Sequence, residues 1–144
     1  MASKWMSRSP IEDHAQERVV IAGALALSRH AGLEDAGVRR FFGQLIVAAK
    51  EVELGWGEHW LWYGFSSPAP LPDLARLRAE LAALTPKLVG ALARVADAPC
   101  QPGERAALTR ASRRLIRTRF VSDTRRAAIV SALLSVRHAG SACR

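Results

Sequence analysis

The chain has 144 residues, 49% of them hydrophobic and 24% charged, which is typical of a folded globular protein rather than a disordered or fibrous one. This length suits one domain, so we expect residues 1–144 to fold as a single unit. Only 6% of the residues are aromatic, and Ala, Leu and Arg recur throughout the chain, which disfavours an all-β sandwich or barrel. The sequence therefore predicts an all-α protein, a bundle of about five to six helices.

The net charge is +8, from 21 Lys and Arg against 13 Asp and Glu. This charge attracts nucleic acids, anionic membrane surfaces and small polyanionic substrates without choosing among them. The longest apolar run, residues 19–27, is too short to cross a bilayer. Acids precede this run at Glu12, Asp13 and Glu17, where a secretory signal would be basic. We therefore interpret the run as a buried helix, and expect any targeting segment to be absent from this chain.

The first long helix is predicted from a start signal and a stop signal. Ser9 can cap a helix, Pro10 suits the first helical position and Glu12 completes a capping box. The helix should run to about His30, because Gly32 follows where a stop is expected. Residues before Ser9 are expected to form an irregular start.

A second helix should begin at Glu34 and Asp35, whose charges suit a helix N-terminus. Apolar residues then recur at spacings of three and four. They are Val38, Phe41, Phe42, Leu45, Ala49 and Val52. This stripe leads into an aromatic stretch, residues 56–65, and then into the Pro- and Ser-rich residues 66–72, which predict a loop.

Three further helices follow this loop. A third helix is predicted from Pro72 and Asp73 to about Ala96, with leucines at helical spacing, then a loop at residues 98–103. Residues 104–117 predict a fourth helix, and residues 122–138 a fifth. In such a bundle we expect a binding site between facing helices, here the first three.

Three side chains could carry chemistry, although each has an ordinary structural interpretation. Glu53 lies beside the apolar stripe, where a carboxylate is usually exposed at the stripe's edge, and if buried must be paired or protonated. Arg78 follows Leu77, and an arginine beside a leucine stripe usually extends its charged end to solvent. Lys4 would ordinarily be a solvated lysine. Taken singly, none of them indicates a function.

Taken together, the order and spacing of these residues resemble the secreted, gamma-type subclass of the all-helical chorismate mutases, over nearly the whole chain. The matching positions are Lys4, Trp5, Pro10, Ile11, Glu12, Asp13, Glu17, Phe41, Phe42, Ala48, Lys50, Glu53, Trp60, Pro72, Leu74, Leu77 and Arg78. The resemblance implies that family's fold, its dimeric habit and its isomerisation of chorismate to prephenate. It implies a reaction with no metal, no cofactor and no covalent intermediate.

The resemblance also implies roles for individual residues. Lys4 matches a lysine that contacts the substrate's ether oxygen and a carboxylate, and Glu53 matches a Glu or Gln that hydrogen-bonds the same oxygen. To donate that hydrogen bond Glu53 must be protonated, so activity should favour acidic pH. Arg78 matches an arginine that binds a substrate carboxylate. Asp13 and Glu17 match acids that contact the substrate hydroxyl.

Three departures from the family pattern leave two interpretations open. Gln16 stands where the family has an arginine, and Ala49 where it usually has Ser or Thr. The family's further arginine on a long first helix is absent, because only three residues precede Lys4. The chain is either a truncated form, or a shortened homologue that is inactive or binds another anionic small molecule. Gln16 and Ala49 favour the second, whereas the retained Lys4, Glu53 and Arg78 favour an active mutase.

The two cysteines, Cys100 and Cys143, allow one disulfide or two thiols, and the residues alone do not choose between these. They match a bridged pair near the C-terminus of some secreted members of the family. The resemblance therefore implies a Cys100–Cys143 bridge in a periplasmic or secreted protein.

Nucleic-acid binding is the rival function. Residues 105–126 hold one acid, Asp123, and only one aromatic, Phe120, which gives little support for base stacking. The same segment has eight arginines: Arg105, Arg110, Arg113, Arg114, Arg117, Arg119, Arg125 and Arg126. We interpret them as a solvated face, and do not expect a nucleic-acid partner.

Overall fold

The computed structural model describes residues 1–66, 70–71, 73–96 and 103–141. These residues form six helices and no named strand, which confirms the predicted all-α class. The helices are α1 (Ala2–Ser7), α2 (His14–His30), α3 (Asp35–Tyr63), α4 (Leu74–Val95), α5 (Glu104–Leu115) and α6 (Asp123–Leu133).

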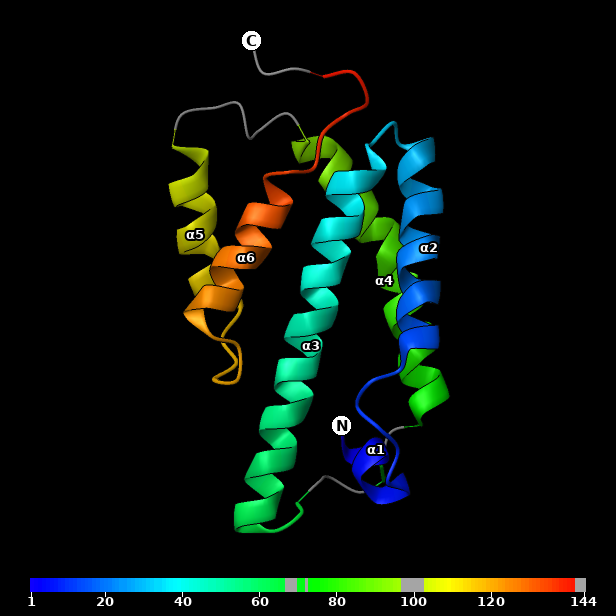
Figure 1. Cartoon of the computed structure of the whole chain (residues 1–144), viewed down its shortest axis with the longest axis vertical. Helices are drawn as coiled ribbons and strands as arrows, with labels where there is room; N and C mark the ends of the chain where they lie inside the picture. The colour runs from blue at the N-terminus through cyan, green and yellow to red at the C-terminus, as the bar shows by residue number, and fades with distance from the viewer. Residues whose placement is uncertain (67–69, 72, 97–102, 142–144) are drawn as a thin grey trace.

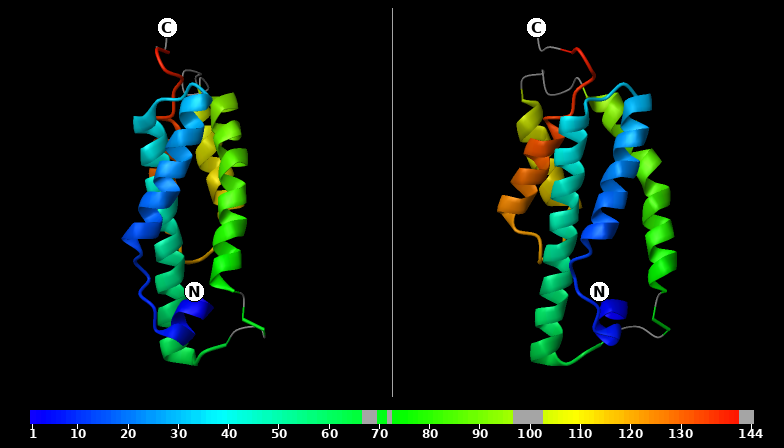
Figure 2. Two further views of the ribbon diagram at one scale, coloured as in Figure 1. Left: turned by 90° about the vertical axis from the view of Figure 1, so that its right-hand side faces the viewer. Right: turned by 45° about the vertical axis from the view of Figure 1, so that its right-hand side comes forward.

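The long helices pack side by side in an order that differs from their order in the chain. Helix α2 lies between α4 and α3 (Figure 2, right), and α6 lies between α3 and α5 (Figure 1). Helices α4 and α5 are therefore the two edges of the bundle. The short helix α1 lies beside the C-terminal half of α3, far from the end where α2 joins α3 (Figure 1).

The core is built by one face of each long helix. Its most completely buried large side chains are Val38 of α3, Leu92 of α4 and Val136, which follows α6. The apolar run at residues 19–27 lies within α2, where Ala24 and Leu25 are buried and the other face is solvated. Only one face of that helix is therefore in the core, as expected for an amphipathic helix.

The first predicted helix start is wrong. Helix α2 begins at His14 rather than at Pro10, and Asp13 caps it by accepting a hydrogen bond from the backbone N–H of Gln16 at 3.0 Å. The Ser9 hydroxyl instead bonds the Ser7 hydroxyl at 2.8 Å. Ser9 therefore belongs to the turn after α1. Arg8 ends that helix with a left-handed backbone conformation, φ 54°, which turns the chain back.

The start of the chain is also not irregular, because residues 2–7 are helical. The other predicted bounds fall close to those observed. Helix α2 ends at His30 with Gly32 at a positive φ of 70°, and α3 begins at Asp35. The last helix is shorter than predicted and ends at Leu133, since the following residues pair with the chain between α2 and α3.

That pairing ties the end of the described chain to the start of α3. The backbone N–H of Glu34 donates to the carbonyl of Arg137 at 2.9 Å, and that of Ala139 donates to the carbonyl of Gly32 at 2.8 Å. No helix among the described residues is both long and apolar enough to span a membrane. The expected Cys100–Cys143 bridge lies outside the described residues.

Candidate active site

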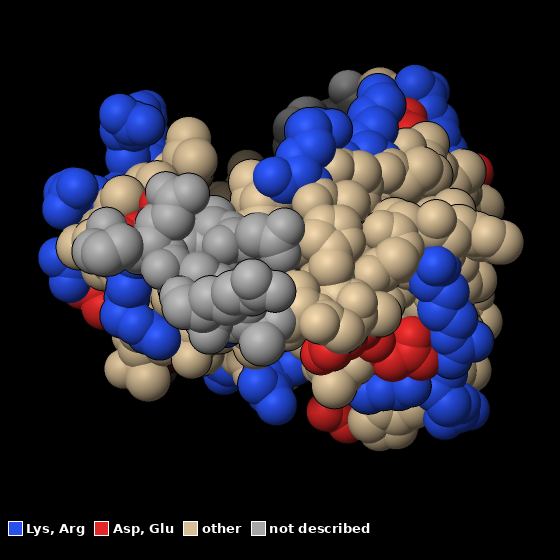
Figure 3. All heavy atoms as spheres, turned by 90° about the horizontal axis from the view of Figure 1, so that it is seen from above, with Lys and Arg blue, Asp and Glu red and all other residues tan. Residues whose placement is uncertain are grey.

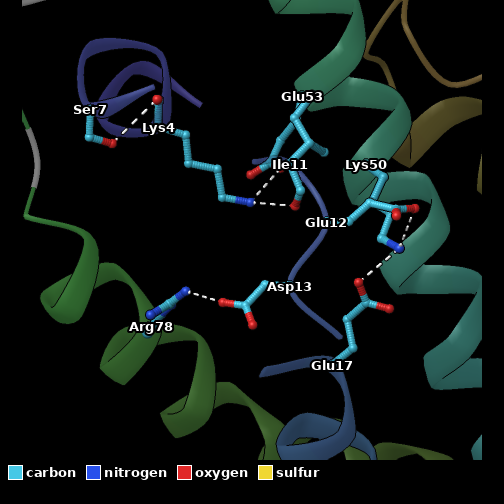
Figure 4. A network of polar contacts seen from close by, with 9 residues as sticks. All are labelled: Lys4, Ser7, Ile11, Glu12, Asp13, Glu17, Lys50, Glu53 and Arg78. Carbon is cyan, nitrogen blue, oxygen red and sulfur yellow. Dashed lines mark hydrogen bonds and ion pairs between the residues drawn. The ribbon is translucent and has the colours of Figure 1, made fainter. Parts of the chain in front are cut away.

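Helix α1 brings Lys4 against the C-terminal half of α3. The Lys4 Nζ atom lies 2.8 Å from Glu53 Oε2 and donates a second hydrogen bond to the carbonyl of Ile11, also at 2.8 Å (Figure 4). The side chains of Lys4 and Glu53 are only 12% and 25% exposed. Two residues that are far apart in sequence therefore form one partly buried ion pair.

Aromatic packing explains why α1 lies at this position. The Trp5 ring meets the Trp60 ring edge-on, with centroids 5.6 Å apart and planes at 69°, and Trp60 is almost fully buried. Gly57 lies on the same face of α3 and has no side chain. A Cβ atom at this position would lie 3.3 Å from the terminal carbon of the Met1 side chain. The tryptophan contact and this close approach set the position from which Lys4 reaches Glu53.

Asp13 links the beginning of α2 to α4. Its Oδ1 atom accepts the capping hydrogen bond from Gln16, and its Oδ2 atom accepts one from Arg78 Nη2 at 2.7 Å. The pKa of Asp13 is lowered, chiefly by the bond from the Gln16 backbone, and further by the charges of Arg78 and Lys4. The carboxylate is therefore held ionised between two cations that approach from α1 and α4.

Lys50 makes a third charged contact, for which the sequence pattern indicates no role. Its Nζ atom lies 2.8 Å from Glu17 Oε1 and 3.5 Å from Glu12 Oε1. The bond to Glu17 raises the pKa of Lys50 and lowers that of Glu17. Lys50 lies three residues before Glu53, and this spacing of about one helical turn was the available sign that the two share a face.

The two departures from the family pattern lie at the same end of the bundle. Gln16 contributes its backbone N–H to Asp13, but its side-chain amide makes no hydrogen bond within the described part of the chain. Ala49 is exposed one turn before Glu53, and its methyl group has no donor to offer. These positions therefore add neither a cation nor a hydroxyl donor to the group.

Each cation at this site is paired with a carboxylate from another element. Arg78 of α4 reaches Asp13, and Lys4 of α1 reaches Glu53 close by, while Lys50 lies on the other side of the segment that leads into α2 (Figure 4). A bound anion would replace protein carboxylates as the partner of these cations. The arrangement is suited to binding a small ligand with more than one carboxylate.

Several arginines of the basic segment are engaged within the protein. Arg125 of α6 donates to Glu51 at 2.8 Å and to Gln44 at 2.6 Å, which joins α6 to α3. Arg126 donates to the carbonyls of Ile116 and Thr118, both at 3.1 Å. Seen from above, basic side chains spread around the rim of the molecule rather than forming one stripe (Figure 3).

No known protein-family model matches the chain. Its sequence is 33% identical over 92 residues to a monofunctional chorismate mutase of Enterobacter agglomerans, a match that covers 62% of this chain and 49% of that protein. The chain thus spans about half the length of this curated relative. Its structure matches the crystal structure of a secreted chorismate mutase from Yersinia pestis with a TM-score of 0.79 and 26% identity, over 94% of this chain and 86% of that one.

The fold is therefore that of the all-helical, secreted type of chorismate mutase. The sequence match to a second mutase agrees with it, and this chain is a chorismate mutase homologue. Both findings confirm the resemblance seen in the sequence.

Proposed function

We propose that this protein converts chorismate to prephenate. In this Claisen rearrangement one ether C–O bond breaks and one C–C bond forms within the same molecule, so no atom or electron is exchanged with the protein. The protein has only to hold a dianion in its reactive conformation and stabilise the negative charge that grows on the ether oxygen. The observation that carries the proposal is that the Lys4–Glu53 pair, from α1 and α3, lies beside the Asp13–Arg78 pair, whose arginine comes from α4 (Figure 4).

Each group has a role that its position supports. Lys4 binds the ether oxygen and a substrate carboxylate, and Glu53, in its protonated form, donates a hydrogen bond to the same oxygen. Arg78 binds the other carboxylate once the substrate has replaced Asp13 as its partner. The substrate hydroxyl donates one hydrogen bond, which either Asp13, thus released, or Glu17 accepts.

The second candidate is a mutase-like protein that binds another anionic small molecule without rearranging it. The observation that favours this alternative is the lack of a cation and a hydroxyl at Gln16 and Ala49. Removal of one bidentate cation weakens carboxylate binding. The two candidates share a binding site and differ only in turnover.

A direct assay separates them. Purified protein is mixed with chorismate, and the loss of chorismate and appearance of prephenate are followed from acidic to neutral pH. Turnover that is abolished by Lys4→Met supports the mutase. If the folded protein shows no turnover at any pH, the mutase proposal fails, and saturable binding of chorismate or another dicarboxylate would favour the alternative.

We also infer that the protein works outside the cytoplasm as a homodimer with a Cys100–Cys143 bridge. The support for export is that the similar solved structure is described as a secreted enzyme. Mass spectrometry of the unreduced protein tests the bridge, which lowers the mass by that of two hydrogen atoms. Two free thiols in protein isolated from its own host would contradict both the bridge and export to an oxidising compartment.

A further inference from the structure

The first turn of α2 is held from two sides by ion pairs. On one side Asp13, which caps the helix, accepts a hydrogen bond from Arg78 of α4 at 2.7 Å. On the other side Glu17, one turn further along α2, meets α3, with its Oε1 atom 2.8 Å from Lys50 Nζ (Figure 4). The backbone joins the two acids, because the N–H of Glu17 donates to the carbonyl of Asp13 at 2.9 Å. Helix α2 therefore begins between two cations that come from different helices.

The two ion pairs differ in how far solvent reaches them. The side chains of Lys50 and Glu17 are 20% and 23% exposed, whereas those of Arg78 and Asp13 are 40% and 38% exposed. The Oε1 atom of Glu17, which lies against Lys50, is itself buried. Opposite charges attract each other more strongly where water is excluded. Glu17 therefore depends on its lysine more than Asp13 depends on its arginine.

Other charged groups also face this pair. Lys50 lies 3.5 Å from Glu12, on the segment before α2. His14 of α2 is exposed, and its Nδ1 atom lies 3.8 Å from Glu17 Oε2. The pKa of Glu17 is lowered chiefly by its contact with Lys50, against the opposing effect of burial, and less by the backbone of Asp13 and the charge of His14. Lys50 is therefore the group that does most to keep Glu17 ionised.

Substrate binding would change the two sides of α2 unequally. In the proposed function Arg78 exchanges Asp13 for a substrate carboxylate, so the ion pair on the α4 side opens. Lys50 lies on the other side of the segment that leads into α2, where it faces two carboxylates of the protein, Glu12 and Glu17 (Figure 4). A cation between two carboxylates is harder for a substrate to withdraw than a cation with one. The Lys50–Glu17 pair is therefore the one that remains.

We propose that Lys50 is a positioning residue for the mutase reaction: it stays paired with Glu17 while substrate is bound, and so holds this carboxylate in place as the acceptor of the substrate hydroxyl. Lys50 does not touch the substrate and acts through Glu17. The hydroxyl is thereby assigned to Glu17 rather than to Asp13, whose carboxylate loses its partner on α4 when substrate binds. This inference rests on the proposed function, although the effect of Lys50 on Glu17 can be measured without substrate.

The proposed reaction needs two acids in opposite protonation states at one pH. Glu53 has to be protonated to donate to the ether oxygen, whereas Glu17 accepts best from the hydroxyl when it is ionised. Without Lys50 the pKa of Glu17 would return toward its ordinary value of 4.5. Lys50 therefore preserves an ionised acceptor at the acidic pH that favours a protonated Glu53.

The pH dependence of kcat/KM tests this role. Lys50→Met should lower kcat/KM by roughly tenfold at pH 6, where Glu17 is ionised but no longer held. At pH 4 the loss should be greater by up to about fourfold, because only about a quarter of a carboxyl with a pKa of 4.5 is ionised there. Lys50→Arg keeps a cation beside Glu17 and should restore the activity at pH 4. Lys87→Met, at an exposed position of α4, is the matched control and should change neither value.

A double variant tests whether Lys50 acts through Glu17. In the Glu17→Gln protein the partner of Lys50 is already uncharged, so adding Lys50→Met should change kcat/KM by less than about twofold. The double variant leaves no carboxylate of this pair buried without a cation. It therefore provides the test even if Lys50→Met alone does not fold, which circular dichroism would show.

Titration of the Glu17 carboxyl by carbon-13 NMR, in the protein without substrate, gives a measurement that is independent of turnover. The midpoint should rise in Lys50→Met and keep its unaltered value in Lys50→Arg and Lys87→Met. If the unaltered protein does not convert chorismate, the proposed function fails and the role of Lys50 fails with it. If it does, three results would each overturn the role of Lys50 alone: an unmoved Glu17 midpoint in Lys50→Met, an equal loss of kcat/KM at both pH values, or a large further loss in the double variant.

Discussion

Glu53 accepts a hydrogen bond from Lys4 across 2.8 Å, so the two groups proposed to share the ether oxygen of the substrate already touch each other without it. The role proposed for Glu53 needs the opposite direction, because a carboxyl that donates to an ether oxygen carries a proton. If the proposal holds, substrate therefore has to replace Lys4 as the partner of Glu53.

Glu53→Gln should broaden the pH range of the mutase activity. The unaltered protein should lose activity as pH rises, since the protonated fraction of Glu53 falls, while a glutamine amide donates its hydrogen bond without needing a proton. The measurement is kcat/KM against pH for both proteins, with Glu58→Gln on the same helix as control. Parallel pH profiles for the Glu53→Gln variant and the unaltered protein would remove Glu53 from this role.

Arg78→Met should raise KM by roughly tenfold or more, because the substrate carboxylate loses a charge-assisted hydrogen bond. Its effect on the free energy of unfolding should be small, since the Arg78–Asp13 pair is exposed by more than a third on both sides. Steady-state kinetics and urea unfolding measure the two effects. Arg76→Met, two residues away on the outer face of α4, should leave KM unchanged.

If Gln16 and Ala49 limit the activity, replacing them should increase it. Gln16→Arg adds a cation beside Asp13, and Ala49→Ser adds a hydroxyl one turn before Glu53. Each should raise kcat/KM, by roughly tenfold for the arginine if it gains a charged hydrogen bond to substrate. Competition assays with a dicarboxylate would show whether the gain lies in binding. A loss of activity in both variants would mean that the site has adapted to Gln16 and Ala49.

The long helices could be predicted because their apolar spacing and terminal residues agree, as at Asp35 and His30. The start of α2 could not, because two overlapping capping patterns compete, one from Ser9 to Glu12 and one from Asp13 to Gln16. Tertiary contacts decide in favour of Asp13, which also binds Arg78. A local pattern contains no information about that distant partner.

Helix α1 was missed because six residues are too few to show a period. It forms where Trp5 packs on Trp60, a contact between residues far apart in sequence. The grouping of Lys4 with Glu53 has the same origin, and only the resemblance to a family placed them at one site. The Lys50–Glu17 pair was missed because a lysine on a polar face is ordinarily solvated.

Acid should destabilise the protein partly through Glu17. Lys50 lowers the pKa of Glu17 in the folded chain below its ordinary value of 4.5. Just below that pH the unfolded chain therefore binds more protons than the folded chain does. Stability from this pair is complete above pH 4.5 and is lost as pH falls through the folded pKa. Glu17→Gln should therefore unfold with a weaker dependence on acid pH, measured by urea unfolding at several pH values. An unchanged slope, with Glu58→Gln as control, would contradict this.

Two glycines of α3 should respond in opposite directions to alanine. A Cβ atom at Gly37 would overlap the carbonyl oxygen of Ser135, a backbone atom that cannot turn aside, so Gly37→Ala should cost about 2–3 kcal/mol of unfolding free energy. A Cβ atom at Gly43 meets nothing within 4 Å, so Gly43→Ala should gain up to about 1 kcal/mol from helix propensity. Urea unfolding of both variants measures the contrast. A neutral Gly37→Ala would mean that the segment after α6 is free to move away from α3, and that the pairing of Glu34 with Arg137 does not hold it.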